Sequence, residues 1–401
     1  MSRKWVKVFL LLAMMSGLCA SVTPITTAHA QSNGRNAPGH DDSDESAVRV
    51  TLLLPLRSPL FAAAANAVRG GFLSAAQHKH GKLQINIVET GDDVQEILAS
   101  YRDAATKSDI IVGPLSRSAV TALAQSSSVI KPTVALAQPD VAEPPLPPQL
   151  LFIGLSIEDE ARQIALWTER DKRPGKIFTI STSIAWQRRA AKAYADQAQR
   201  IGMAVESLEL SLPNGSISQS GLAQLRQRIQ AEKPALLFVA LDAIQTIQLR
   251  DAVGNDLPLY GTSQLNPLTL DSRLKSSAKA SAAADKASLP ADDRFPELNG
   301  VHLVDMPWQL EQENAIVITY QRARPASNEV RSNADIERLY ALGIDAYRIA
   351  NQIAQQHSGF DVDGVTGQIY VNMDRSATYF QRRETQAVYQ DGVVVPLSSQ
   401  R

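Results

Sequence analysis

The sequence predicts an α/β fold in which two doubly wound, parallel-sheet lobes are joined by a hinge. Short, continuously apolar segments alternate with alanine-rich or amphipathic helical segments, and this alternation occurs twice in succession. Strands that are apolar on both faces are typical of parallel sheets covered by helices on two sides. The chain length agrees, because 401 residues exceed what a single hydrophobic core usually supports.

The first series begins where a polar stretch gives way to the apolar residues after Val48. Ser156 is followed three residues later by Asp159, which is similar to a capping box and predicts a helix from there to about residue 170. A proline-rich break at 144–148 precedes that helix. The other elements are expected as strands at 48–56, 83–89, 109–112, 133–137 and 152–155 and helices at 60–77, 94–107 and 116–124.

The second series repeats the pattern, with strands expected at 176–181, 204–210, 235–241 and 257–261 and helices at 185–201, 221–232 and 243–253. An Ala/Ser/Lys-rich stretch at 271–293 lacks apolar periodicity, which predicts a mobile surface insertion.

The last part of the chain is expected to cross the hinge several times. A strand at 300–306 is followed by a break at Pro307, a polar loop to about residue 333, a long helix at 334–356 and short strands at 367–372 and 386–395. We therefore expect lobe 1 to comprise 48–157 and 308–361, and lobe 2 to comprise 158–307 and 362–401.

The first thirty residues have the layout of a secretory signal peptide, with a basic start, an apolar run at 8–15 and Ala28-His29-Ala30 before the expected cleavage site. A flexible leader at 31–47 follows, and no later stretch is apolar enough to span a bilayer. The mature chain is expected in the periplasm. An outer-membrane lipid anchor on Cys19, the only cysteine, is the alternative. It is poorly supported, because Leu18 precedes Cys19 where a lipoprotein signal has a small residue.

Composition and motifs argue against several functional classes. Removal of the signal peptide takes away three basic residues, which leaves 37 of the 40 Lys and Arg against 41 Asp and Glu. The resulting formal charge of −4 does not favour binding to nucleic acid. The sequence contains no nucleophile elbow, phosphate loop or zinc-protease helix, so we expect no enzyme, cofactor or metal. His78-Lys79-His80 is interpreted as a solvated turn, and Glu158-Asp159-Glu160 as charges that complement a helix dipole.

Loops at the carboxyl ends of the strands are the candidate ligand cleft, because open α/β sheets place ligands there. Each of these loops, taken alone, can also be explained as a helix cap. Arg57, in the first of them, either pairs with an anionic ligand or points to solvent. The candidate cleft residues are Arg57, Ser58, Leu115, Ser116, Gln138, Trp186, Asp242 and Gln264.

Several motifs together resemble the penicillin-binding-protein activator family of LpoA/LppC type. They include Asp-Met-Pro-Trp at 305–308, Leu-Gly-Ile-Asp-Ala-Tyr at 342–347 and Ile-Val-Gly-Pro-Leu at 111–115. The resemblance covers nearly all of the chain from Val48 onward. It implies a type I periplasmic-binding-protein fold, assistance to peptidoglycan synthases at the outer membrane and no enzyme activity.

Two functions therefore follow as expectations. The first is a non-catalytic envelope protein that acts by docking on a peptidoglycan synthase, a penicillin-binding protein. The alternative is a periplasmic solute receptor that closes on an amino acid or peptide-like ligand and feeds an ABC transporter. In the second case Ser58, Ser116, Trp186 and Gln264 are expected to become buried on closure.

Overall fold

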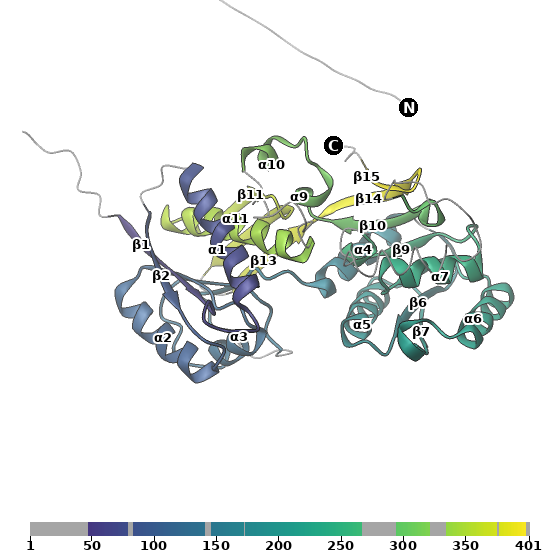
Figure 1. Cartoon of the computed structure of the whole chain (residues 1–401), viewed down its shortest axis with the longest axis horizontal. Coiled ribbons are helices and arrows are strands. Elements are labelled where there is room, and N and C mark those ends of the chain that lie inside the picture. Colours follow the sequence, from purple (N-terminus) through teal and green to yellow (C-terminus); the bar gives the residue numbers. More distant parts are fainter. Residues whose placement is uncertain are drawn as a thin grey trace, which may run out of the picture. The chain divides into compact units, whose positions relative to one another are not determined.

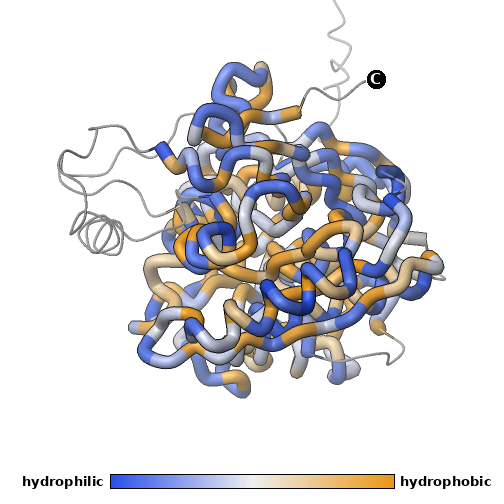
Figure 2. The backbone as a smooth tube through the Cα atoms, turned by 90° about the vertical axis from the view of Figure 1, so that its right-hand side faces the viewer, coloured by the Kyte–Doolittle hydropathy of each residue, from blue (hydrophilic) through white to orange (hydrophobic). Residues whose placement is uncertain are grey.

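The computed structural model describes residues 47–78, 83–140, 146–171, 173–266, 294–320, 334–374 and 377–397. The expected signal peptide, the leader up to residue 46, the insertion at 271–293, the loop at 321–333 and His80 lie outside these residues. Within the described part, short apolar stretches alternate with hydrophilic ones along the chain (Figure 2).

The first sheet is wholly parallel, with the strand order β2-β1-β3-β4-β5. Its strands are β1 (Val48–Leu54), β2 (Leu83–Glu89), β3 (Ile110–Val112), β4 (Thr133–Ala135) and β5 (Leu150–Phe152). The helices of this part are α1 (Ala62–His78), α2 (Val94–Lys107) and α3 (Arg117–Ala124) (Figure 1).

Strand β1 shows why this sheet is covered on two sides. Val50, Leu52 and Leu54 pack in one core with α1 and α11 (Ala334–Ala354). Leu53, between them, packs in a separate core with α2 and α3. Successive side chains of a strand point to opposite faces, so continuous apolarity is what a doubly covered strand requires. The prediction of a doubly wound parallel sheet is confirmed here.

The second sheet has the order β15-β14-β10-β9-β8-β6-β7 and is parallel from β10 to β7. Its strands are β6 (Ile177–Thr182), β7 (Val205–Leu210), β8 (Leu236–Val239), β9 (Leu259–Gly261), β10 (Val301–Asp305), β14 (Thr385–Gln390) and β15 (Val393–Pro396). The accompanying helices are α4 (Ile157–Arg170), α5 (Ala185–Arg200), α6 (Gln219–Glu232) and α7 (Ala243–Val253), with short 3₁₀ turns η1 (Pro213–Gly215), η2 (Ser263–Leu265) and η4 (Pro296–Leu298).

One edge of this sheet corrects the sequence prediction. The single strand expected at 386–395 is a hairpin of β14 and β15, and β14 runs antiparallel to β10. Asp391 and Gly392 form its two-residue turn with φ values of 50° and 76°. Asp-Gly accommodates two successive left-handed residues, as a tight hairpin requires. The Asp-Gly pair is therefore a hairpin signal that the sequence itself contains.

A second correction concerns the segment after β10. Pro307, expected to break the structure, begins α9 (Pro307–Leu310), and α10 (Ala315–Thr319) follows. Proline suits the first turn of a helix because the N–H that it lacks has no partner there.

The chain then adds a small antiparallel sheet of β11 (Gly359–Asp363), β12 (Gln368–Asp374) and β13 (Ala377–Arg383). Val362, Val365, Ile369 and Val371 belong to the same core as β1 and α1. Residues 362–383, which the sequence analysis assigned to the second lobe, thus supply apolar side chains to the first core.

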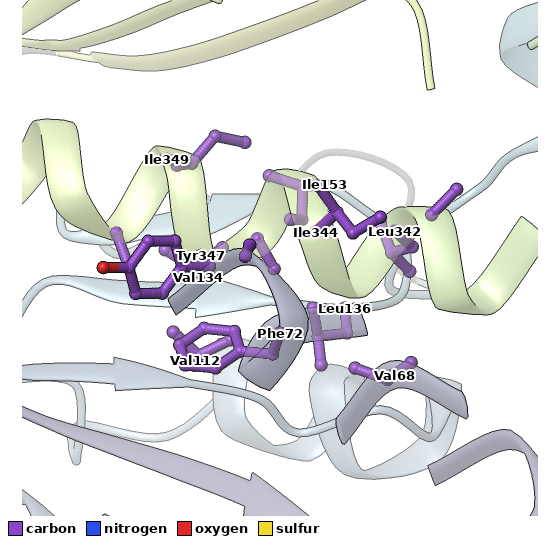
Figure 3. Packing of buried hydrophobic residues seen from close by; sticks show 14 of the residues in the cluster. Val68, Phe72, Val112, Val134, Leu136, Ile153, Leu342, Ile344, Tyr347 and Ile349 are labelled. Atoms are coloured by element: carbon purple, nitrogen blue, oxygen red, sulfur yellow. The ribbon is translucent and has the colours of Figure 1, made fainter. Parts of the chain in front are cut away.

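Helices α1 and α11 make an unusually close backbone approach beside the first sheet. A Cβ atom added to Gly343 would lie 2.1 Å from the carbonyl oxygen of Val68, and one added to Gly71 would lie 1.8 Å from that of Tyr340. Phe72 and Tyr347 meet edge to face next to this crossing, with their ring centroids 5.3 Å apart (Figure 3). Glycine at both positions is therefore a packing requirement.

We expect Gly343→Ala to lower the free energy of unfolding by about 1–3 kcal/mol or more, because the added methyl group meets backbone that cannot move aside. Urea unfolding measures this change. Gly359→Ala is the control, since nothing lies within 4 Å of a Cβ there, and it should change stability by less than about 0.5 kcal/mol. Equal effects of the two substitutions would contradict the close-packing explanation.

Candidate functional site

The candidate site is a pocket of about 370 Å³ where elements of both large sheets meet. Three chain segments connect the first core to the second sheet here. They are the link from β5 to α4, the link from β10 to α9, and Glu384 between β13 and β14. Side chains from all three line the pocket, together with residues of η2 and α11.

One of these links, at Glu384, is fastened to helix α4 by a side-chain amide. The Nε2 atom of Gln163 on α4 donates to the carbonyl oxygen of Glu384 at 2.8 Å, and the backbone N–H of Glu384 donates to Oε1 of Gln163 at 2.9 Å. A glutamine that satisfies both backbone groups of one residue acts like a neighbouring strand. Glu384 is thereby held at a fixed place beside α4.

An ion pair between Asp305 and Arg338 lies at the centre of the site. Asp305 ends β10 and is 1% exposed, while Arg338 comes from α11 and is 5% exposed. Nη2 of Arg338 lies 2.6 Å from Oδ2 of Asp305, and Nε lies 3.2 Å from Oδ1. Burial alone opposes the charge on Arg338, but the neighbouring Asp305 carboxylate holds the pKa of the guanidinium above its usual value.

Further donors complete the shell of Asp305. The side-chain amide of Asn266 donates to Oδ2 at 2.8 Å, and the backbone N–H of Met306 donates to Oδ1 at 2.8 Å. Arg338 also reaches Oδ1 of Asp335 at 3.2 Å. These donors satisfy both oxygens of Asp305 in a place that is otherwise shielded from water.

Glu160, on the first turn of α4, faces the same pocket without a cationic partner of its own. Its carboxylate accepts the backbone N–H of Ser263 at 2.8 Å and the Ser263 hydroxyl at 3.1 Å. Burial, supported by the negative charge of Asp305, raises the pKa of Glu160 to about 7.

Glu384 is the second acid of this kind. The residue is half-buried, but its Oε2 atom is enclosed and has no hydrogen-bond donor within the described part of the chain. Burial and the nearby charge of Glu160 raise the pKa of Glu384 well above its usual value. The pocket therefore contains two carboxyl groups with raised proton affinity.

Trp186 and Gln264 are the two sequence-predicted residues that line this pocket. The other six do not line it. Ser58, Ser116 and Asp242 accept backbone N–H groups at the starts of helical segments, as caps do. Leu115 lies in the first core, and Gln138 is half-buried outside the pocket lining.

Arg57 faces solvent, which is one of the two alternatives that the sequence left open. It is exposed, and its guanidinium pairs with Glu96 of α2 and donates to the carbonyl oxygen of Glu89 at 3.3 Å. The ligand-facing hydroxyls expected after the first strands are thus occupied as caps, and Arg57 is held within its own lobe.

The central residues Glu160, Asp305, Arg338 and Glu384 were not predicted from the sequence. Glu160 does lie in the first turn of α4 with Glu158 and Asp159, but its side chain reaches across to Ser263. Arg338 offered the best signal, because it shares a buried helical stripe with Leu342 and Asp345. A charged residue in such a stripe needs a buried partner.

Other site types find no support in the described residues. Within them, no His, Cys, Asp and Glu side chains are grouped so as to hold a metal ion. None of the described helices is both long and apolar enough to cross a membrane.

Comparison with known proteins extends these observations. A family model described as "LppC putative lipoprotein" matches residues 43–392. A protein named penicillin-binding protein activator LpoA from Yersinia pseudotuberculosis is 28% identical over 347 residues, and one of the same name from Haemophilus influenzae is 24% identical over 347 residues. These alignments cover 79% and 83% of this chain, which spans about half the length of the curated relatives it matches (50% and 52%).

Solved structures agree on the fold. The chain is similar to a structure titled as a "putative branched-chain amino acid ABC transporter" from Chromobacterium violaceum, with 31% identity, a TM-score of 0.64 and coverage of 85% of this chain and 100% of that one. The C-domain of Haemophilus influenzae LpoA, titled a regulator of PBP1A, matches with 21% identity and a TM-score of 0.62, covering 87% of this chain and 99% of that one. The predicted type I periplasmic-binding-protein fold is confirmed by these matches.

We expect Arg338→Met to destabilise the protein by about 3–5 kcal/mol, because it leaves the Asp305 carboxylate buried without its cation. Chemical unfolding followed by circular dichroism measures the loss. The control is Arg188→Met, which removes an exposed ion pair with Glu209 at 2.6 Å and should change stability by less than about 1 kcal/mol. If both variants lose the same small amount, the central role of the buried pair is wrong.

The raised pKa of Glu160 predicts a specific pH dependence. The folded state holds this proton more tightly than the unfolded state, whose glutamate has its ordinary pKa, so the stabilising contribution is complete in acid and is lost as pH rises through about 7. In Glu160→Gln nothing titrates at this position. The difference in free energy of unfolding between wild type and Glu160→Gln should fall by on the order of 1–3 kcal/mol between pH 5 and pH 8.

The control for this measurement is Glu209→Gln. Its salt bridge with Arg188 lowers the pKa of Glu209, so its titration lies below this pH window and the difference from wild type should stay constant. Parallel pH profiles for wild type and Glu160→Gln would show that Glu160 has no raised pKa.

Proposed function

Because this chain belongs to the LppC family, we propose that it is an exported, non-catalytic envelope protein that regulates a peptidoglycan synthase, a penicillin-binding protein, by docking on it. The observation that carries the proposal is the family match over residues 43–392. It spans the first sheet, the second sheet except β15, and every connection that lines the pocket.

The printed names of the relatives support this assignment. The curated relatives are named activators of penicillin-binding proteins, and the matched structure from Haemophilus influenzae is titled a regulator of PBP1A. That structure is a C-domain, and this chain covers 99% of it. We propose for this chain the activity of its longer relatives, on the basis of the part that they share with it.

A docking protein benefits from a fixed shape before it meets its partner, because ordering a surface during binding reduces the affinity. We propose that the chain consists of two lobes, each built on one large sheet, with the hinge at the three links. The buried Asp305–Arg338 pair and the Gln163 bridge restrain that hinge. Residues 362–383 share the first core, so we assign them to the first lobe.

A second function is favoured by one specific observation. The 31% identical structure that this chain covers completely is titled an amino acid ABC transporter protein, and the pocket here has a volume suited to a small ligand. The second proposal is therefore a periplasmic solute receptor. The two proposals differ in what the protein must contact, which is a synthase in one case and a membrane permease in the other.

We expect the purified chain to bind an immobilised penicillin-binding protein from the same cell, with a Kd in about the micromolar range, and to change its rate of peptidoglycan synthesis. Biolayer interferometry measures binding, and polymerisation of a labelled precursor measures the rate. The control is a solute receptor of the same fold, which should do neither. A well-folded chain that neither binds nor alters any of the cell's penicillin-binding proteins would move the assignment to the solute receptor.

A further inference from the structure

Strand β15 is the last strand at one edge of the second sheet, and within the described residues it pairs only with β14 (Figure 1). We propose that this edge binds an extended, positively charged peptide segment of a protein partner, which joins the sheet as one more strand. The inference deepens the proposed docking function, on which it rests for the identity of the partner. The segment itself is identified by its chemistry, as extended backbone that carries lysine or arginine side chains.

The register of the hairpin determines which backbone groups of β15 point outward. Hydrogen-bonded and non-hydrogen-bonded pairs alternate along an antiparallel ladder. The N–H of Leu397 donates to the carbonyl oxygen of Gln386 at 2.8 Å, and Val394 lies opposite Tyr389, three pairs further along. Val394 therefore belongs to a non-hydrogen-bonded pair. Its N–H and its carbonyl oxygen point away from β14.

The other side of β14 leads to the same conclusion. The N–H of Gly300 donates to the carbonyl oxygen of Tyr389 at 2.9 Å, so Tyr389 directs its polar groups toward β10 and away from β15. Val394 and Pro396 are thus the outward-facing residues of β15, and they offer one N–H and two carbonyl oxygens, because proline has no N–H. Within the described residues, no turn or loop backbone bonds to any of these three groups.

A groove of about 680 Å³ lies beside this edge. One wall is formed by residues 309–314, and the other by Gly392, Val393, Val394 and Pro396 of the hairpin. Val393 is 42% exposed although it is an apolar residue of a strand. An exposed apolar edge is a template for pairing with another chain. The groove therefore offers an added strand both free backbone groups and apolar surface.

The charge of the groove indicates the charge of its occupant. The lining contains Glu311 and Glu313 but no lysine, arginine or histidine. The carboxylate of Glu311 accepts from two neutral donors, the Thr385 hydroxyl at 2.6 Å and the Asn314 amide at 2.7 Å. Glu313 is exposed, and among the described residues no cation pairs with either glutamate. A segment with lysine or arginine side chains supplies the complementary charge.

A second copy of this chain fits the edge less well. It would bring the same two glutamates to the groove. Symmetric pairing about Val394 would also set Pro396 opposite Gly392 of the second copy, and the N–H of Gly392 already donates to Oδ1 of Asn299 at 2.8 Å. The carbonyl oxygen of Pro396 would then have no donor. Charge and hydrogen bonding thus both favour a different chain as the occupant.

Val394→Pro tests the proposal, because it removes the outward N–H without breaking a hydrogen bond of the hairpin. Val394→Thr is the matched control, since it keeps the N–H and the β-branched shape. Biolayer interferometry measures binding of the full-length mature chain to the penicillin-binding protein that wild type binds. We expect Val394→Pro to raise the Kd at least about tenfold and Val394→Thr to change it by less than about twofold. Thermal unfolding verifies that both variants are folded.

The result separates this inference from the proposed function. If wild type and folded Val394→Pro bind the synthase equally well, the β15 edge is not the docking surface, whereas the docking function stands. If no penicillin-binding protein of the cell binds wild type, the docking function is wrong, and a peptide probe then decides the inference.

The probe is a fluorescently labelled peptide of four Lys-Val repeats, and four Glu-Val repeats are its comparison. Fluorescence anisotropy should give a Kd below about 1 mM for the Lys-Val peptide with wild type and Val394→Thr, and a Kd at least about tenfold higher with Val394→Pro. The Glu-Val peptide should bind more weakly than the Lys-Val peptide. No binding of the Lys-Val peptide to wild type, or equal binding to Val394→Pro, would overturn the proposal.

Glu313→Lys tests the charge of the groove, and it needs no change in the strand if Val394→Pro does not fold. It should weaken binding of the Lys-Val peptide at least about threefold, because it places a cation where the segment brings its own. The control is Glu169→Lys, at an exposed glutamate of α4 that does not line the groove, and it should have a smaller effect. Equal effects would mean that only the net charge of the protein matters and would overturn the proposed site.

Discussion

The ion pair between Asp305 and Arg338 joins two parts of the molecule that have separate hydrophobic cores. Asp305 ends a strand of the second sheet, whereas Arg338 projects from a helix packed on the first. Two such charges lose much of their hydration on burial, so a buried pair seldom adds net stability compared with apolar residues of the same shape. Its consequence here is geometric. The guanidinium fits the carboxylate in a narrow range of orientations, and this restricts how α11 meets the end of β10.

The carboxyl groups around this pair differ in the number of hydrogen-bond donors that they have. Asp305 has the guanidinium of Arg338, the Asn266 amide and a backbone N–H as donors. Glu160 has only Ser263, and the enclosed oxygen of Glu384 has no donor within the described residues. The neighbours of each carboxyl group therefore differ, and burial is poorly compensated at the two glutamates. The negative charge of Asp305 raises the pKa of both glutamates further, and the charge of Glu160 adds to this at Glu384.

The fold was predictable from the sequence to a large extent, and the site was not. Strand β8 is apolar at every position, and so are the last three residues of β1, which indicates burial on both faces without knowledge of partners. The Asp391-Gly392 pair is an equally clear signal, and it divides the single strand expected at 386–395 into a hairpin. Glu160 presents a different difficulty, because its position at a helix start already has a sufficient local explanation. Its contact with Ser263, 103 residues away, depends on how the chain links meet, and a local pattern contains no such information.

Helix α11 shows how packing and the site depend on one another. Gly343 permits the close approach to α1, and Arg338 lies five positions earlier on the same helix. Two positions after Gly343, Asp345 accepts the backbone N–H groups of Val365 and Thr366 at 3.1 and 2.8 Å, which fixes the turn between β11 and β12. A rigid helix transmits a displacement along its axis. Any widening at Gly343 would therefore move the guanidinium relative to Asp305 and the Asp345 carboxylate relative to its turn. The glycine is thus part of the site's geometry although it lies outside the pocket, and this explains why one helix carries a close-packed face and two buried charges.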